Sequence, residues 1–295
     1  IDQELTAAAM QKADEIKQAF LDWVWTDDER RDMLTRLYNE KFNTNVPPTY
    51  DGSHLELVGA SEAVKLRPHQ KNAVWRAIQE GTCLFDHVVG AGKTLACVAT
   101  VMESKRMGFL SKPMIVVPNH LLYQWKDEFY KLYPDANILV ADKTDFTKQN
   151  RERLFGRIAT GDWDAVIIGH SQFEKIPISN ERLANEISLE IEKITAAIED
   201  LGSADGRRFS VKQLESKKKN LQAKYEELTA QEVKDDIFCF EQLGVDYMFV
   251  DEAHMFKNCM ITTKLSNVAG LSTTSSNKSM DMLWKCKYLS EIQNG

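Results

Sequence analysis

Long apolar runs are missing from this sequence, which argues against a helix that spans a membrane. Apolar stretches such as Met114–Val117 and Ala165–Ile168 fall far short of the roughly 18–20 residues that such a helix needs. No signal peptide opens the chain, because Asp2, Glu4 and Lys12 interrupt its first apolar stretch. We therefore expect a cytoplasmic protein with no membrane partner.

Paired cysteines and an excess of positive charge are missing too. The five cysteines form no C-x-x-C pair and no metal-like cluster with histidine, so we expect reduced thiols rather than disulfides or a zinc site. Lysine and arginine number 37 against 44 aspartates and glutamates, a net charge of −7. This balance argues against a small basic nucleic-acid-binding module. It remains compatible with a motor that contacts nucleic acid through one face.

The composition that is present indicates a globular protein, since 43% of the 295 residues are hydrophobic and 27% are charged. At about 100–200 residues per domain, the length fits one large domain or two small ones. The first residue is Ile1 rather than Met, so we expect the chain to be a piece of a longer protein.

The first 45 residues predict helices followed by a linker. Apolar residues recur at helical spacing, and Phe20 and Trp23 share one face, which favours a packed core. Stacking of the aromatic side chains on nucleic-acid bases is the alternative. Asn, Pro, Asp and Gly cluster within residues 43–54. We therefore divide the chain into an N-terminal helical region with its linker (1–50) and a larger domain (51–295).

From about residue 64, short apolar runs alternate with helical segments. The predicted strands are Cys83–Val88, Met114–Val117, Ile138–Val140, Ala165–Ile168 and Tyr247–Val250. The predicted helices are Arg67–Gln79, Thr94–Arg106, His120–Leu132 and Thr147–Ile158. This alternation indicates an α/β fold with a mainly parallel sheet, and strands without polar alternation are typical of a sheet covered on both faces.

Residues 180–234 interrupt this pattern with two helical stripes. Apolar residues recur at alternating three- and four-residue spacings over 187–201 and again over 211–228, with Lys218 as the polar member of the second stripe. A glycine-containing turn joins the stripes, which predicts an inserted antiparallel helical hairpin. Lys217–Lys219 on this hairpin either touch a phosphate backbone or form a solvated helical face.

The segment Asp86-His-Val-Val-Gly-Ala-Gly-Lys-Thr94 carries the strongest chemical signal, because it follows a predicted strand and opens a predicted helix. Gly90 and Gly92 let backbone N–H groups turn toward a phosphate, and the helix N-terminus adds partial positive charge. Lys93 can reach the β- and γ-phosphates, and the Thr94 hydroxyl can ligate Mg²⁺. The alternative is a glycine-rich turn without a ligand.

A second signal, Asp251-Glu-Ala-His254, ends the apolar run Tyr247–Val250. The carboxyl end of a parallel strand is where such sheets bind ligands. Asp251 could hold Mg²⁺ opposite Thr94, and Glu252 could orient and deprotonate an attacking water. The alternative is an acidic turn exposed to solvent.

Together these segments resemble the Walker A motif and the DEAH box of superfamily-two helicases and translocases. Further segments resemble the Snf-type branch of that superfamily, namely Leu66-Arg-Pro-His-Gln70, Ile115-Val-Val-Pro118 with Leu121-Leu-Tyr-Gln-Trp-Lys-Asp-Glu-Phe129, Ile167-Ile-Gly-His-Ser-Gln-Phe173 and Asp251-Glu-Ala-His-Met-Phe-Lys-Asn258. His87 departs from the Walker A pattern, since it stands where the first glycine is usual.

The resemblance implies a RecA-like P-loop domain that uses ATP and Mg²⁺ and moves on double-stranded DNA. It implies catalytic roles for Lys93, Asp251, Glu252 and His254, of which His254 couples the ATP site to a second RecA-like domain. The implied ATP-binding residues are Arg67, Gln70, His87, Gly90, Ala91, Gly92, Lys93 and Thr94, with Mg²⁺ at Thr94 and Asp251. The implied DNA-binding residues are Pro118, Asn119, Gln124, His170 and Ser171. A buried His170 with satisfied hydrogen bonds is the alternative for that residue.

A narrower resemblance concerns very large bacterial mobile-element proteins that join a Snf-like helicase to an adenine-specific DNA methyltransferase. His87–Thr94 and Val268-Ala-Gly-Leu-Ser272 are similar to segments of these proteins, as are Phe20–Trp25 and Tyr38–Phe42 ahead of the helicase. This resemblance implies a bacterial source and an effector domain C-terminal to the chain.

Several elements of a complete motor are missing from the sequence. No motif III run follows the DEAH box, no second RecA-like domain follows, and no methyltransferase D-P-P-Y or N-P-P-Y tetrapeptide is present. We therefore expect the N-terminal ATP-binding lobe of an ATP-dependent DNA helicase or translocase, slow by itself because an arginine finger is worth roughly 10³–10⁵ in rate. The alternative is a non-catalytic RecA-like scaffold that binds DNA or protein through the hairpin.

Overall fold

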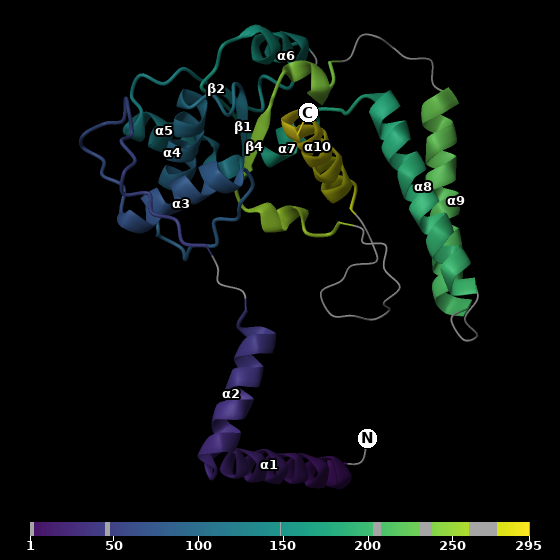
Figure 1. The fold of residues 1–295 in the computed structure, drawn as a ribbon. Coiled ribbons are helices and arrows are strands. Elements are labelled where there is room, and N and C mark those ends of the chain that lie inside the picture. The colour runs from purple at the N-terminus through teal and green to yellow at the C-terminus, as the bar shows by residue number, and fades with distance from the viewer. Residues whose placement is uncertain are drawn as a thin grey trace. The chain divides into compact units, whose positions relative to one another are not determined.

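The computed structural model describes residues 3–44, 48–147, 149–202, 208–230, 238–259 and 276–294. The chain divides into two compact units, Ile1–Tyr50 and Asp51–Gly295 (Figure 1). The segment Val268–Ser272, part of the narrower resemblance, lies outside the described residues. Among the helices that are described, none combines the length and apolar character that a membrane crossing requires.

The N-terminal unit consists of α1 (Gln3–Trp25) and α2 (Asp28–Phe42). The Arg30 guanidinium lies 4.0 Å from the centre of the Trp23 ring and donates to the Trp23 carbonyl, which ties the two helices at their junction. The prediction of a packed core is wrong for this unit, since Phe20 is 55% and Trp23 50% exposed. Two helices joined by a short turn enclose no interior, so the aromatic face stays at the surface.

The larger unit is built on a four-stranded sheet with the order β2-β3-β1-β4. The strands are β1 (Pro113–Val117), β2 (Ile138–Ala141), β3 (Ala165–Gly169) and β4 (Tyr247–Val250). All three neighbouring pairs are parallel. The predicted α/β class and parallel sheet are therefore confirmed, and this is the arrangement expected of a RecA-like domain.

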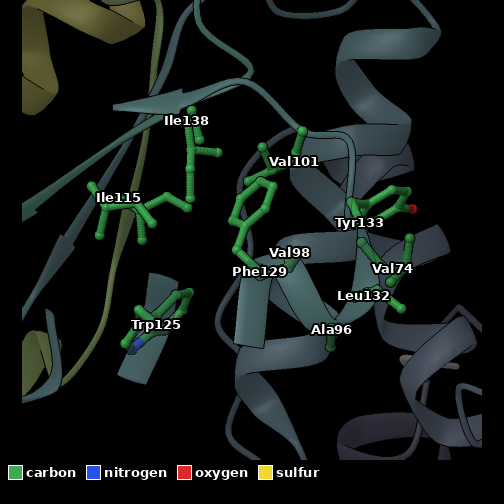
Figure 2. Packing of buried hydrophobic residues seen from close by; sticks show 14 of the residues in the cluster. Val74, Ala96, Val98, Val101, Ile115, Trp125, Phe129, Leu132, Tyr133 and Ile138 are labelled. Atoms are coloured by element: carbon green, nitrogen blue, oxygen red, sulfur yellow. The ribbon is translucent and has the colours of Figure 1, made fainter. Parts of the chain in front are cut away.

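Helices cover both faces of this sheet, because alternate strand residues join two different apolar clusters. Ile115 and Val117 of β1 belong to one cluster, while Met114 and Val116 belong to the other. The first face is covered by α3 (Pro68–Glu80), α4 (Lys93–Arg106), the short helix η1 (Asn119–Leu121) and α5 (Leu122–Leu132). Figure 2 shows Phe129 of α5 packed in this cluster beside Val101 and Ile138.

The second face is covered by α6 (Arg151–Thr160), α7 (His170–Phe173), η2 (Phe240–Leu243) and α10 (Asn277–Asn294). This cluster contains several buried phenylalanines, and the rings of Phe173 and Phe240 meet edge to face with centres 6.1 Å apart. Helix α6 begins at Arg151 rather than at the predicted Thr147.

The inserted hairpin is confirmed as α8 (Asn180–Gly202) and α9 (Arg208–Ala230), which lie side by side (Figure 1). Lys218 is half-buried, as its position on the apolar stripe requires. The base of the hairpin is tied to α10 by an ion pair of 2.7 Å between Arg182 and Glu291.

One predicted strand is absent, since Cys83–Val88 forms no ladder. Gly81, just before this segment, is tied to β4, because the Tyr247 hydroxyl donates a hydrogen bond to the Gly81 carbonyl. Val88 is exposed, and β4 is only half-buried along its length. The apolar pattern predicted a strand because it records hydrophobicity, whereas a strand also needs backbone partners, which this segment lacks.

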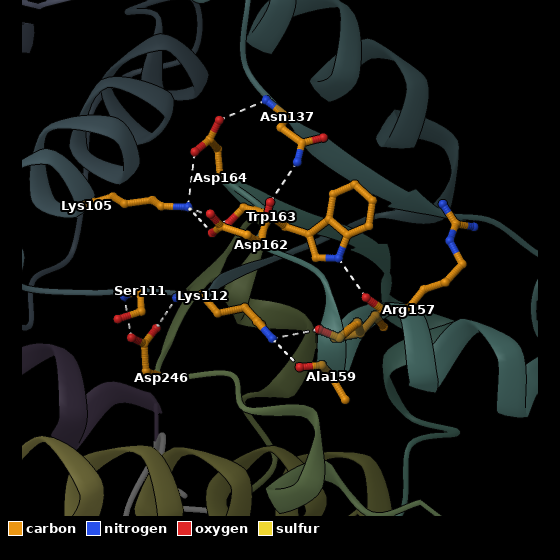
Figure 3. A network of polar contacts seen from close by, with 11 residues as sticks. Lys105, Ser111, Lys112, Asn137, Arg157, Ala159, Asp162, Trp163, Asp164 and Asp246 are labelled. Carbon is orange, nitrogen blue, oxygen red and sulfur yellow. Dashed lines mark hydrogen bonds and ion pairs between the residues drawn. The ribbon is translucent and has the colours of Figure 1, made fainter.

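Polar contacts hold the amino ends of the strands (Figure 3). Lys112 lies just before β1 and Asp246 lies just before β4. The backbone N–H of Lys112 donates to Asp246 Oδ1 over 2.9 Å. In the same way the N–H of Asn137 donates over 2.8 Å to Asp164 Oδ2, just before β3. Lys105 pairs with Asp164 at 3.1 Å. These contacts lie at the opposite end of the strands from the candidate site, which is at the carboxyl ends.

Candidate nucleotide and nucleic-acid site

The carboxyl ends of three strands bring the sequence candidates to one edge of the sheet. Pro118 follows β1, His170 follows β3 and Asp251 follows β4. The three strands are parallel and in register, with Val116 opposite both Ile168 and Val250. The sheet therefore places the DEAH residues beside two of the segments expected to touch nucleic acid.

The glycine-rich loop enters α4 through two residues in the left-handed region. Gly90 has a φ of 82° and Gly92 a φ of 78°. Gly92 is also the N-cap of α4, so Lys93 and Thr94 form its first turn. A Cβ at Gly92 would lie 2.2 Å from Gln70 Nε2. The left-handed backbone favours glycine there, and a Cβ would displace the Gln70 amide from its place against the loop.

Gln70 braces this loop from the start of α3. Its Nε2 donates to the carbonyls of Ala91 (3.2 Å) and Gly92 (3.1 Å), and its Oε1 accepts from the N–H of Arg67 (2.7 Å). His69, which no motif had singled out, adds a contact of 3.1 Å from its Nε2 to the Ala91 carbonyl. The buried amide of Gln70 is thus engaged with the protein backbone, while the Arg67 side chain is exposed.

Lys93 and His87 contact each other across the loop. Lys93 Nζ donates over 2.8 Å to the carbonyl of His87, the residue at the first glycine position. The His87 ring stacks on Phe85 with centres 6.1 Å apart, and its buried Nδ1 has no hydrogen-bond partner. A phosphate that reaches Lys93 must therefore compete with a backbone carbonyl.

Cys97 lies one turn further along α4 and has a strongly shifted pKa. The pKa of its thiol is raised to about 12, first by burial and then by the charge of Asp251, whereas the Lys93 ammonium lowers it. The charges of Lys93 and Asp251 thus act on this thiol in opposite directions. No sequence motif pointed to this residue.

Hydrogen bonds hold both the backbone and the carboxylate of Asp251. Its N–H continues the sheet by donating to the Val116 carbonyl over 2.9 Å. Its Oδ1 accepts from the N–H of Glu252 at 3.1 Å, and its Oδ2 accepts from Trp125 Nε1 at 3.0 Å. Its carbonyl lies 3.0 Å from His170 Nε2. The orientation of the carboxylate is therefore set by groups from α5 and from its own turn.

Glu252 has an unusual backbone. Its φ of 52° is positive, which no other non-glycine residue within the described ranges shows. Such strain gathers at functional sites. Its Oε2 lies 3.0 Å from His254 Nδ1 at the start of η3 (Ala253–Phe256), and both side chains are exposed.

The five candidate DNA-contacting residues divide into a bonded pair and three further residues. Asn119 Nδ2 donates to Ser171 Oγ over 2.7 Å, and the Ser171 N–H donates back to Asn119 Oδ1 over 3.2 Å. Pro118 is half-buried beside this exposed pair, and Gln124 is exposed on α5. His170 is buried, and burial lowers its pKa. The alternative of a buried, hydrogen-bonded histidine therefore describes His170.

The two residues expected to hold Mg²⁺ carry oxygen donors that suit a hard cation. Thr94 supplies a hydroxyl and Asp251 a carboxylate, and oxygen ligands of this kind are what Mg²⁺ prefers. No cluster of three or more His, Cys, Asp or Glu able to hold a metal occurs within the described ranges. A nucleotide-borne Mg²⁺ takes most of its ligands from phosphate and water, so Thr94 and Asp251 are the two protein groups that would hold it.

Comparisons with known proteins agree with a helicase-like domain. A model for a probable helicase domain matches residues 75–294, and one for a domain of unknown function (DUF8437) matches residues 1–44. "Defense against restriction protein B" of Escherichia phage P1 is 24% identical over 322 residues, which cover 95% of this chain and 14% of that protein. The Sulfolobus solfataricus SWI2/SNF2 ATPase core in complex with dsDNA is 20% identical, with a TM-score of 0.32 over 41% of this chain and 24% of that one. The chain thus spans a small part of the curated relative, and it belongs to the family of probable helicase domains.

Proposed function

We propose that the chain is the N-terminal ATP-binding lobe of an ATP-dependent DNA helicase or translocase. The observation that carries this proposal is that both motifs lie at the ends of regular elements of one α/β unit. Lys93 and Thr94 open α4 directly after the left-handed Gly92, and Asp251 directly follows β4 at the carboxyl edge of the sheet. The charges of Lys93 and Asp251 both act on the pKa of the Cys97 thiol of α4. Membership of the helicase domain family supports it.

In this proposal each group at the edge has one task. Lys93 leaves the His87 carbonyl and binds the β- and γ-phosphates of ATP. Thr94 and Asp251 hold the Mg²⁺ that neutralises phosphate charge. Glu252 orients the attacking water and accepts its proton. His254, bonded to Glu252, faces the second RecA-like domain that completes the site.

DNA contacts would come from the same edge. Asn119 and Ser171 already bond each other at the surface, so their polar groups are positioned for a phosphate backbone. The relative from phage P1 is far longer than this chain. On the narrower resemblance described above, we infer that the lobe belongs to a large cytoplasmic protein of a bacterial mobile element, together with a second lobe and an effector domain such as a methyltransferase.

The test uses the full-length protein that carries this chain. Its ATPase rate is measured with and without duplex DNA for the natural protein, Lys93→Ala and Glu252→Gln. Both variants should lose at least about a hundredfold in rate, and DNA should raise the rate of the natural protein. An ATPase that ignores both DNA and Lys93→Ala would contradict the proposal.

A second candidate is a non-catalytic scaffold that binds DNA or protein through the hairpin. It is favoured by two contacts, because the Lys93 ammonium and the Gln70 amide are both bonded to backbone carbonyls. Titration of this chain with a fluorescent ATP analogue separates the two functions. Binding that never appears, even at millimolar analogue with Mg²⁺, would favour the scaffold.

A further inference from the structure

The indole of Trp125 makes a contact that the sequence motifs do not explain. Trp125 lies on α5 and is 3% exposed. Its Nε1–H donates to Asp251 Oδ2 over 3.0 Å, across 126 positions of the chain. A buried indole N–H needs a hydrogen-bond partner, which a neutral carbonyl can supply. Here the partner is the charged carboxylate that ends β4.

This contact completes a clamp on the Asp251 carboxylate. The N–H of Glu252 bonds Oδ1, and the Trp125 N–H bonds Oδ2. Two donors on the two oxygens oppose rotation of the carboxylate about its last side-chain bond. Each carboxylate oxygen still has capacity for a second partner, so the clamp does not prevent metal binding.

The two donors differ in how firmly they are anchored. The Glu252 N–H belongs to a strained, exposed turn, whereas the Trp125 ring is packed in the apolar cluster with Ile115 and Phe129 (Figure 2). Because the indole ring is fixed by packing in the core, its N–H holds the carboxylate oxygen in a fixed position. Outer groups that orient a metal-binding side chain commonly change metal affinity when they are removed.

We propose that Trp125 is a positioning residue, whose indole N–H holds the Asp251 carboxylate in the orientation that receives the Mg²⁺ of a bound nucleotide. The inference rests on the proposed nucleotide site. It separates two contributions to nucleotide binding: Trp125 acts through the metal, whereas Lys93 acts on the phosphates directly.

The test compares Trp125→Phe with Trp163→Phe in this chain. Trp163 is a matched control, because its Nε1–H donates over 2.8 Å to the Arg157 carbonyl at the opposite end of the strands (Figure 3). Binding of a fluorescent ATP analogue is measured over a series of Mg²⁺ concentrations and in EDTA. Trp125→Phe should require about tenfold more Mg²⁺ and bind as the natural chain does in EDTA, while Trp163→Phe should match the natural chain throughout.

The outcomes distinguish this inference from the proposed function. If Trp125→Phe matches the natural chain while Lys93→Ala loses binding in both conditions, the positioning role is overturned and the nucleotide site stands. An equal loss for Trp125→Phe with and without Mg²⁺ marks a structural role and also overturns it. If Lys93→Ala binds as the natural chain does, the nucleotide site and this inference fail together.

A second measurement does not depend on Trp125→Phe folding. In the ¹⁵N-labelled natural chain, the Trp125 indole signal is identified as the one displaced by Asp251→Asn. Adding Mg²⁺ to the nucleotide-bound chain should shift this signal more than the other five indole signals. A Trp125 signal that does not respond to Mg²⁺ would overturn the inference.

Discussion

We expect Lys285→Met to lower the free energy of unfolding of the larger unit by about 3–5 kcal/mol, the usual result of removing one partner of a buried ion pair. Lys285 lies on α10 and is 0% exposed. Its ammonium donates to Asp281 Oδ2 over 2.6 Å and to the Phe173 carbonyl over 3.0 Å, and it lies 4.1 Å from the centre of the Phe173 ring. Methionine keeps the apolar stem but leaves the Asp281 carboxylate without its cation.

The pair itself contributes less than this loss. Burial lowers the pKa of Lys285 and raises the pKa of Asp281, because each charge loses water on folding, and their mutual attraction only opposes these shifts. Replacement of both partners by apolar residues is often neutral or stabilising. The double variant Lys285→Met with Asp281→Leu should therefore regain at least about 2 kcal/mol relative to Lys285→Met.

Urea unfolding, monitored by far-UV circular dichroism and by fluorescence, measures these differences in the free energy of unfolding. Trp284 provides a fluorescent probe on α10. The matched control is Lys131→Met, which removes an exposed lysine paired with Glu128 on the surface of α5 and should change stability by less than about 1 kcal/mol. A Lys285→Met variant no less stable than the control would refute the reasoning. So would a double variant less stable than Lys285→Met.

Three further predictions follow from single contacts. Gly92→Ala places a Cβ 2.2 Å from Gln70 Nε2 in a left-handed residue, so stability should fall by at least about 1–2 kcal/mol and analogue binding should weaken, as thermal unfolding and titration would show. Burial raises the pKa of Tyr247 from 10.0 to about 12, so its contribution to stability is full below pH 10 and is lost as the pH rises through 12. Urea unfolding of Tyr247→Phe should show a smaller loss of stability between these values than the natural chain shows. Asn119→Ala should weaken duplex-DNA binding in the full-length protein about fivefold, the equivalent of about 1 kcal/mol; equal weakening by Asn137→Ala, at the other end of the strands, would contradict a specific contact.

The sequence patterns predicted elements well where hydrophobicity alone specifies them. Strands β1, β3 and β4 lie within a residue of their predicted bounds, because strands covered on both faces are apolar at nearly every position. The hairpin α8–α9 follows from its repeated apolar stripes in the same way. The segment Cys83–Val88 begins with three apolar residues but forms no strand, since pairing depends on a distant neighbour. Phe20 and Trp23 share a helical face, but no other element of their unit covers it.

The candidate site divides in a similar way. The sequence by itself determined which residues could carry chemistry, and the parallel order of the strands implied that Pro118, His170 and Asp251 would share an edge. Only the tertiary structure decided which atoms meet, such as the Trp125 indole with the Asp251 carboxylate and the Gln70 amide with the glycine-rich loop. The physical reason is that motifs depend on local spacing, whereas these hydrogen bonds depend on how α3 and α5 pack against the sheet, which many distant apolar contacts set together.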